Sequence, residues 1–141
     1  MKKSMMVLGM AVVMGACGGQ TTEPLADGAA VQEIQLSDTV RLKVGEAARV
    51  QGAGVLIRLE EIVADSRCPI DALCVHAGDA VVGIGVSGRS DGTLRLHANG
   101  EPKRGVVGDV AVRLLEVAPA PVSTRPTLPA EYSVSLEVSH R

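Results

Sequence analysis

The sequence is nearly devoid of aromatic residues. It contains no Trp and no Phe, and Tyr132 is its single Tyr. A folded core must therefore be built from Val, Leu, Ile and Ala. The shortage also leaves almost no aromatic surface on which sugars or nucleic-acid bases could stack, as bases do in single-strand binding sites.

Excess positive charge is also missing. The 14 Lys and Arg residues are outnumbered by 16 Asp and Glu residues, which gives a formal net charge of −2 at pH 7. Acids and bases are interspersed, a pattern typical of a soluble surface without a charge block. The chain lacks the basic footprint of a nucleic-acid-binding protein, so we expect no nucleic-acid partner.

Recognisable catalytic motifs are absent as well. The Gly-x-Ser-x-Gly string at residues 88–92, G-R-S-D-G, has the sequence of a hairpin tip and not of the strand-to-helix elbow of a hydrolase. No glycine-rich turn leads into a helix that could hold phosphate. Glu60 and Glu61 are adjacent on a predicted strand, so we expect their side chains to face opposite sides of a sheet. We therefore expect a protein that is not an enzyme and has no cofactor.

The N-terminus has the pattern of an export signal. Residues 1–16 begin with Lys2 and Lys3, continue as a short apolar run and end in small residues before Cys17. The run is too short for a membrane-spanning helix, which needs about 20 apolar residues. The string M-G-A-C at residues 14–17 resembles the lipobox of bacterial lipoproteins, although Met14 stands where leucine is usual. The alternative is ordinary signal cleavage that leaves Cys17 as a free thiol.

A lipobox would make Cys17 the acylated first residue of the mature protein. Several acyl chains on one residue hold a protein durably to a membrane, whereas one chain alone is marginal. Residues 17–30 are small, polar and unperiodic, which predicts a flexible tether between the lipid and a domain over residues 31–141. Gly18 is not the aspartate that retains such proteins at the inner membrane. We expect a lipoprotein of the bacterial cell envelope, in the outer membrane, facing the periplasm or the cell surface.

Short runs of alternating apolar and polar residues fill the mature chain. Residues 39–44, 93–97 and 133–138 each alternate strictly, which predicts half-buried strands. The inward side chains would be Val40, Leu42, Val44, Leu94, Leu96, Val134, Leu136 and Val138. Turn signals separate the runs, and Asn99-Gly100 in particular favours a two-residue hairpin. Seven to nine such strands, with no helical period, predict a single all-β domain, an antiparallel sandwich or barrel.

An internal repeat refines this prediction. Residues 55–63, V-L-I-R-L-E-E-I-V, match residues 110–118, V-A-V-R-L-L-E-V-A. In each copy the apolar phase shifts after the leucine, as a β-bulge requires. Each copy is followed by a loop that returns as a strand, with the cysteines in the first loop and four prolines in the second. The alternative is chance similarity between valine-rich strands.

Residues 65–79, D-S-R-C-P-I-D-A-L-C-V-H-A-G-D, hold the other two cysteines. In an exported protein the oxidising compartment favours pairing, so we expect a structural disulfide between Cys68 and Cys74. A closed loop this short stabilises the fold by about 2.4 kcal/mol through lost chain entropy. Pro69 restricts the loop further.

A metal site is the alternative for the same residues. Cys68, Cys74 and His76 are ligand types that suit copper or zinc, and Asp71 or Asp79 could complete the shell. The Cys-x5-Cys-x-His spacing matches neither zinc modules nor haem attachment motifs. His97 falls on the polar side of its predicted strand, from which it could approach the loop, whereas His140 is expected to be exposed.

The cysteine stretch also resembles a group of small secreted bacterial proteins and lipoproteins with the pattern D-S-R-C-P-x4-C-x-W-A-G-x-A. The group's later pattern, L-L-E-V-x-P-x-P and Y-x-V-x-L-x-V, matches residues 114–121 and 132–138. The resemblance implies a secreted β domain and assigns no activity. His76 departs from it, because the group usually has tryptophan there.

These observations predict a lipid-anchored binding or structural module. If the two loops lie at one end of the domain, they could form a surface for a protein partner, as loops on rigid β scaffolds often do. A disulfide-constrained loop loses little entropy on binding, so it could also be presented to a protease as an inhibitor presents its loop. A contiguous apolar patch beside the disulfide would favour binding, and its absence a structural role.

Overall fold

The computed structural model describes residues 30–141. The predicted signal peptide, the predicted lipidation site at Cys17 and all of the predicted tether except Ala30 lie outside the described residues. Within the described range, no helix is long and apolar enough to cross a membrane.

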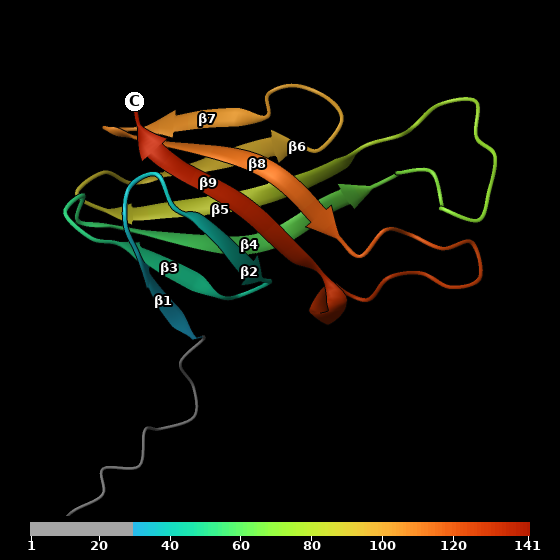
Figure 1. Ribbon diagram of the computed structural model, residues 1–141, viewed down its shortest axis with the longest axis horizontal. Coiled ribbons are helices and arrows are strands. Elements are labelled where there is room, and N and C mark those ends of the chain that lie inside the picture. Colours follow the sequence, from blue (N-terminus) through green and yellow to red (C-terminus); the bar gives the residue numbers. More distant parts are fainter. Residues whose placement is uncertain (1–29) are drawn as a thin grey trace, which may run out of the picture.

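Nine strands and one turn of 3-10 helix make up residues 30–141, and Figure 1 shows them coloured along the chain. Their bounds are β1 Val31–Ile34, β2 Thr39–Lys43, β3 Ala47–Val50, β4 Val55–Asp65, β5 Ala80–Gly88, β6 Gly92–His97, β7 Arg104–Val107, β8 Val110–Ala118, η1 Pro129–Glu131 and β9 Ser133–His140. The three strands predicted from strict alternation are β2, β6 and β9.

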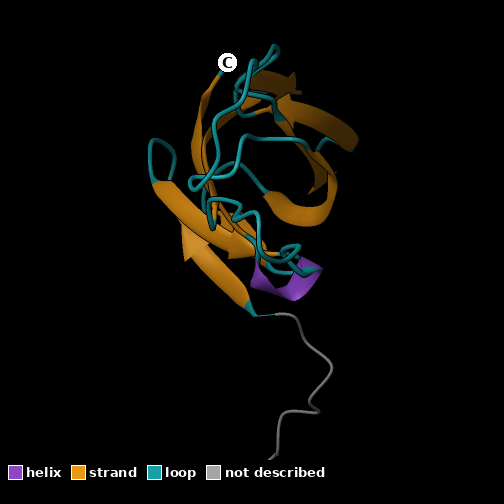
Figure 2. Cartoon of the chain, turned by 90° about the vertical axis from the view of Figure 1, so that its right-hand side faces the viewer, coloured by secondary structure: helices purple, strands orange, loops and turns teal. Residues whose placement is uncertain are grey.

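The strands form two stacked sheets, which confirms the all-β prediction and identifies the fold as a sandwich and not a closed barrel. The five-stranded sheet has the order β1-β3-β4-β5-β6, and the four-stranded sheet has the order β2-β9-β8-β7. Strand β1 runs parallel to β3, and the other neighbouring strands are antiparallel. Figure 2 views the sandwich from the end where the two longest loops gather.

Aliphatic side chains from both sheets fill the space between the layers. Their largest fully buried members are all Leu, Ile or Val, as the composition requires. The predicted inward positions are buried at Val40, Leu42, Leu96, Val134, Leu136 and Val138. Val44 and Leu94 are only partly buried and pack at the margin of this core. Burying each large aliphatic side chain contributes about 1.5–3 kcal/mol to folding.

The internal repeat corresponds to equivalent strands in the two sheets. Strand β4 pairs with β5 in one sheet, and β8 pairs with β9 in the other. The register shifts between Leu59 and Glu61 in β4 and between Leu114 and Glu116 in β8, which are matching positions of the two copies. The bulge predicted from the change in alternation is thus present in both.

The same bulge shows that the prediction for Glu60 and Glu61 was wrong. Both side chains are exposed on the outer face of the five-stranded sheet, Glu60 over Gly85 and Glu61 over Gly83. These two glycines are two residues apart in β5 and therefore share a face. The extra residue in a bulge interrupts the strict alternation of sides, so neighbours in sequence can face the same way.

The hairpin predicted at Asn99-Gly100 is not formed. Strands β6 and β7 belong to different sheets, so this turn lies in a link between the layers. Neither residue has the positive φ that the expected turn type requires. Instead, the carboxylate of Asp79 accepts hydrogen bonds from the backbone N–H groups of Asn99 at 2.8 Å and Gly100 at 3.3 Å.

Candidate binding surface at the loop end

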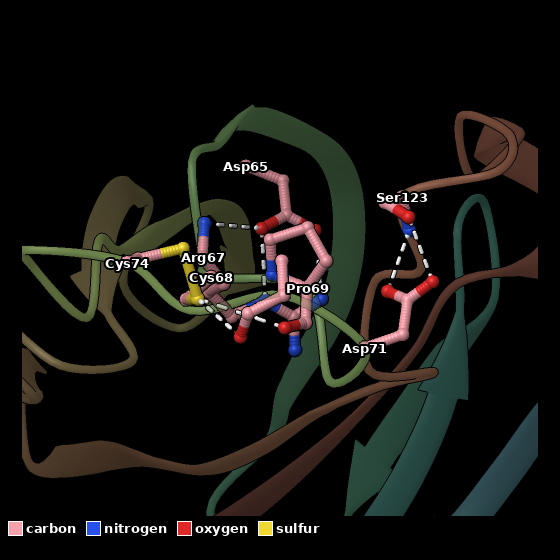
Figure 3. The surroundings of a disulfide bond; sticks show 8 residues. Asp65, Arg67, Cys68, Pro69, Asp71, Cys74 and Ser123 are labelled. Carbon is pink, nitrogen blue, oxygen red and sulfur yellow. Dashed lines mark hydrogen bonds and ion pairs between the residues drawn. A yellow bond between two sulfur atoms is a disulfide. The ribbon is translucent and has the colours of Figure 1, made fainter.

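Two long loops leave the same end of the sandwich (Figure 1). The cysteine loop, residues 66–79, joins β4 to β5, and the proline loop, residues 119–132, joins β8 to β9. The backbone N–H of Ile70 donates to the carbonyl oxygen of Pro121 at 3.0 Å. Ser123 donates to the Asp71 carboxylate from its backbone N–H at 2.8 Å and from its hydroxyl at 2.7 Å (Figure 3). These bonds hold the two loops side by side.

The predicted disulfide joins Cys68 to Cys74, with their Cα atoms 5.9 Å apart (Figure 3). Inside the ring, the N–H of Ala72 donates to the carbonyl oxygen of Pro69 at 3.1 Å and closes a tight turn. At its base, the N–H of Cys68 donates to the carbonyl oxygen of Ala77 at 2.8 Å. The tip of the cysteine loop is therefore held by a covalent bond and by backbone hydrogen bonds.

Arg67 fixes the base of the cysteine loop. Its guanidinium pairs with both carboxylate oxygens of Asp65, at 2.8 Å and 2.7 Å. The same group donates to the carbonyl oxygens of Val117 at 2.5 Å and Pro119 at 2.9 Å, which lie where β8 leads into the proline loop. The side chains of Arg67 and Asp65 are only 12% and 9% exposed. This largely buried pair ties the cysteine loop to the opposite sheet.

The hydroxyl of Tyr132 completes the network by donating to Asp65 at 2.9 Å. Burial is the largest single effect on Asp65 and opposes its ionisation, but the hydrogen bonds from Arg67 and Tyr132 outweigh it and lower the pKa of Asp65. Burial, and then the neighbouring carboxylate, raise the pKa of Tyr132. Near neutral pH the cluster thus contains a charged pair and a neutral phenol.

The tip of the cysteine loop is apolar and exposed. Ile70 is 74% exposed, Val75 is 94% exposed and Leu73 is wholly exposed. Leu128, in the proline loop, is also exposed. These three cysteine-loop side chains, called the apolar tip below, flank the disulfide.

The residues of the metal hypothesis are not assembled into a site. Within residues 30–141, no three His, Cys, Asp or Glu side chains gather in a way that could hold a metal ion. The sulfur atoms of Cys68 and Cys74 are bonded to each other, and His76 is exposed. Asp71 is engaged by Ser123. Copper or zinc binding therefore stays a prediction for a protein in which both thiols are free.

His97 does approach the cysteine loop, as the sequence allowed, but its contact is with Asp79 at the end of that loop. Nδ1 of His97 lies 2.5 Å from a carboxylate oxygen of Asp79. Burial again opposes ionisation of this carboxyl, while hydrogen bonds from Asn99, His97 and Gly100 lower its pKa overall. Asp79 serves to anchor the link between β6 and β7.

An open cavity of about 680 Å³ lies between the end of β4 and the proline loop. Its apolar walls are formed mainly by Ile62, Pro69, Pro121, Pro126, Pro129 and Tyr132. Four charged residues also line it: Glu61, Asp65, Arg67 and Arg125. Pro69 belongs to the disulfide ring, so the cavity adjoins the base of the apolar tip.

Sequence reasoning identified the cysteines but missed the Asp65, Arg67 and Tyr132 cluster and the cavity. The predicted resemblance contained an indication, because the D-S-R, V-x-P and Tyr elements all belong to its pattern. In the structure these three elements meet in one network. The three elements lie far apart in the sequence, so the sequence alone did not show that they are in contact.

No family model matches the chain, and no curated protein or solved structure is significantly similar to it.

Proposed function

We propose that this protein is a non-catalytic binding module of the bacterial cell envelope that holds a protein partner at its loop end. The observation that carries the proposal is the apolar tip, in which Ile70, Leu73 and Val75 are exposed on a loop closed by a disulfide. Removing a large aliphatic side chain from water contributes about 1.5–3 kcal/mol before the costs of association are subtracted. Exposed apolar surface of this kind is characteristic of interaction sites.

The fixed conformation of the loop supports this proposal. Ordering a flexible loop on binding costs free energy, and a loop that is already constrained avoids part of that cost. The Cys68 to Cys74 bond, the Asp71 and Ser123 hydrogen bonds and the Arg67 contacts all restrain the segment that carries the tip. The segment that carries the apolar tip is therefore already ordered before a partner binds.

The pattern that the chain resembles also supports a shared scaffold with a variable contact surface. Asp65, Arg67 and the two cysteines fall at fixed positions of D-S-R-C-P-x4-C. Ile70, Leu73 and Val75 all fall at positions that the pattern leaves free. Such a division suits a family in which the framework is common and the partner differs.

In this proposal, residues 1–16 direct export and a lipid on Cys17 anchors the mature chain to a membrane. Residues 17–30 tether the domain through β1, which lies at an edge of the five-stranded sheet. In Figure 1 the start of β1 lies well away from the two loops. This separation supports an arrangement in which the apolar tip faces a partner and not the anchoring membrane.

The proposal can be tested by capturing partners on the immobilised mature chain carrying Cys17→Ser. Envelope proteins of the source bacterium should be retained by this protein and lost when Ile70, Leu73 and Val75 are all replaced by Ser. The matched control is Val106→Ser, which removes a 38% exposed side chain from β7, where Val106 pairs with Ala111 near the end of β8 opposite the loops. Thermal unfolding verifies that all variants fold.

The proposal would be contradicted if the triple-Ser variant retained the same envelope proteins as the protein with the native apolar tip. If the captured protein is a protease, inhibition of its activity by the native loop tests the inhibitor alternative directly. Zinc and copper titrations of the reduced protein, with His76→Ala as control, test the metal alternative.

A further inference from the structure

The two arms of the disulfide ring are held to the domain in different ways. Ile70 and Asp71, on the first arm, form hydrogen bonds to the proline loop. Residues 73–76, L-C-V-H, are all exposed, and within residues 30–141 none of their backbone N–H or C=O groups forms a hydrogen bond. Apart from the chain itself, the restraint on this second arm is therefore the bond from Cys74 to Cys68.

The two sulfur atoms of this bond have different surroundings. Cys68 is partly buried, and its Sγ atom lies 3.6 Å from the carbonyl oxygens of both Pro69 and Ala72 (Figure 3). Cys74 is exposed, as are the residues on both sides of it. Thiol–disulfide exchange begins with a thiolate attacking one sulfur, so its rate depends on access to that sulfur. The carbonyl oxygens repel a thiolate near Cys68 because they carry partial negative charge, which leaves Cys74 as the accessible sulfur.

We propose that Cys74 is a site of thiol–disulfide exchange with a dithiol reductant, and that exchange releases the second arm of the ring. A thiolate of the reductant attacks Sγ of Cys74 and forms a mixed disulfide, while the bond to Cys68 breaks and Sγ of Cys68 leaves as a thiolate. The second thiolate of the reductant then attacks the reductant sulfur of the mixed disulfide and releases Cys74. The two released sulfurs take up the two protons that the reductant's thiols lost. The protein gains two thiols, and the reductant is oxidised to a disulfide.

Reduction changes only part of the apolar tip. Exposed disulfides are reduced more readily than structural ones and include the regulatory examples. Leu73 and Val75 lie on the arm that reduction releases, whereas Ile70 stays on the arm that is bonded to the proline loop. Ordering a released segment again on binding costs free energy. The consequence for binding rests on the proposed function: the oxidised protein should bind its partner more tightly than the reduced protein.

The site of exchange can be tested without a partner, using the mature chain with Cys17→Ser. The probe is glutathione, whose single thiol forms the mixed disulfide, and excess N-ethylmaleimide stops the reaction early and alkylates the free thiol. Peptide mass spectrometry should locate glutathione on Cys74 and the maleimide on Cys68, with an excess of about tenfold over the reverse arrangement. Equal amounts of the two products, or a majority with glutathione on Cys68, would overturn the assignment.

A rate measurement tests whether the folded protein exposes the bond. Dithiothreitol should reduce the native protein at a rate within about tenfold of the rate in urea that unfolds the chain. A slower native rate would mean that the fold shields the disulfide and would overturn the inference.

Amide relaxation measured by NMR tests the release of the second arm. On reduction, the order parameters of residues 73–76 should fall from about 0.85 to below about 0.6, whereas those of residues 70–71 should change little. The matched control replaces both Cys68 and Cys74 with Ser and should have the low values with or without reductant. Unchanged order parameters for residues 73–76 in the reduced protein would contradict the release.

Failure of this inference is distinguishable from failure of the proposed function. In the capture experiment, the reduced protein should retain envelope proteins about tenfold more weakly than the oxidised protein. Equal retention by the two forms, with loss in the triple-Ser variant, would refute only the redox control. Exchange at Cys74 together with capture that does not depend on the apolar tip would refute only the proposed function.

Discussion

The guanidinium of Arg67 donates to the carbonyl oxygen of Val117 at 2.5 Å, and this bond joins the two sheets at the loop end. Arg67 follows β4 of the five-stranded sheet, whereas Val117 lies in β8 of the four-stranded sheet. Because the same guanidinium also holds Asp65, one side chain determines how the cysteine loop leaves the sandwich.

Replacement of Arg67 should be strongly destabilising. Arg67→Met leaves the largely buried carboxylate of Asp65 without its cation. Breaking a fully buried pair costs about 3–5 kcal/mol, so the loss here should lie at the lower end of that range. The control is Arg41→Met, which breaks the exposed pair with Glu116, whose two side chains are 60% and 58% exposed. That loss should be under about 1 kcal/mol. Urea unfolding measures both values, and similar losses for the two variants would contradict the structural role of Arg67.

The stability of the fold should depend on Asp65 at acid pH. The pKa of Asp65 in the folded protein lies below its ordinary value of 3.8. A carboxyl with a lowered pKa stabilises the fold above its unfolded pKa, and that contribution is lost as the pH falls through the folded pKa. The free energy of unfolding should therefore decline below about pH 4. Asp65→Asn combined with Arg67→Met should decline less steeply between pH 5 and pH 3, and identical slopes would argue against this assignment.

The disulfide should be present in the exported protein and should contribute modestly to stability. Using the mature chain with Cys17→Ser, mass spectrometry should detect two alkyl groups only after reduction. Replacing Cys68 and Cys74 with Ser should lower the free energy of unfolding by about 2.4 kcal/mol while the sandwich still forms. Alkylation of both thiols without reduction would mean that the bond is absent and would favour the copper or zinc alternative.

Two glycines with the same backbone requirement should respond differently to substitution. Gly78 has a φ of 66°, and an added Cβ would overlap the backbone carbonyl of Ser66. Gly45 has a φ of 90°, but an added Cβ there meets nothing within 4 Å. Both Ala variants carry the strain of positive φ, whereas Gly78→Ala also displaces the base of the cysteine loop, which puts its cost near the upper end of about 0.5–3 kcal/mol. Equal unfolding free energies for the two variants would show that the base of the cysteine loop shifts at little cost to accommodate the added Cβ at residue 78.

Local sequence patterns account for much of the fold. The alternation around Leu42, Leu96 and Leu136 predicted both the strands and their buried faces, since the period of a strand is a local property. The change of phase after Leu59 and Leu114 predicted the two bulges. The disulfide was predicted because Cys68 and Cys74 lie close together in the sequence and the third cysteine, Cys17, belongs to the predicted lipobox.

Features that depend on distant contacts were not predictable in this way. The position of Glu61 followed from how the bulge pairs with β5, which alternation alone does not specify. Asn99-Gly100 adopts a different turn because its backbone N–H groups donate to the carboxylate of Asp79, a residue from another loop. The Arg67 contact with Val117 joins residues from both sheets, so it exists only after the sandwich has assembled.

The pairing of β2 with β9 has a consequence for the order of assembly. Thr39 pairs with Glu137 and Lys43 with Ser133, so one of the earliest strands of the domain has the last strand as its partner within the sheet. A ribosome delivers the chain from its N-terminus, so the backbone groups of β2 have no partner strand in their own sheet until residues 133–140 have emerged. The four-stranded sheet is therefore completed only once β9 is available, and a chain interrupted before β9 leaves β2 without a partner in that sheet.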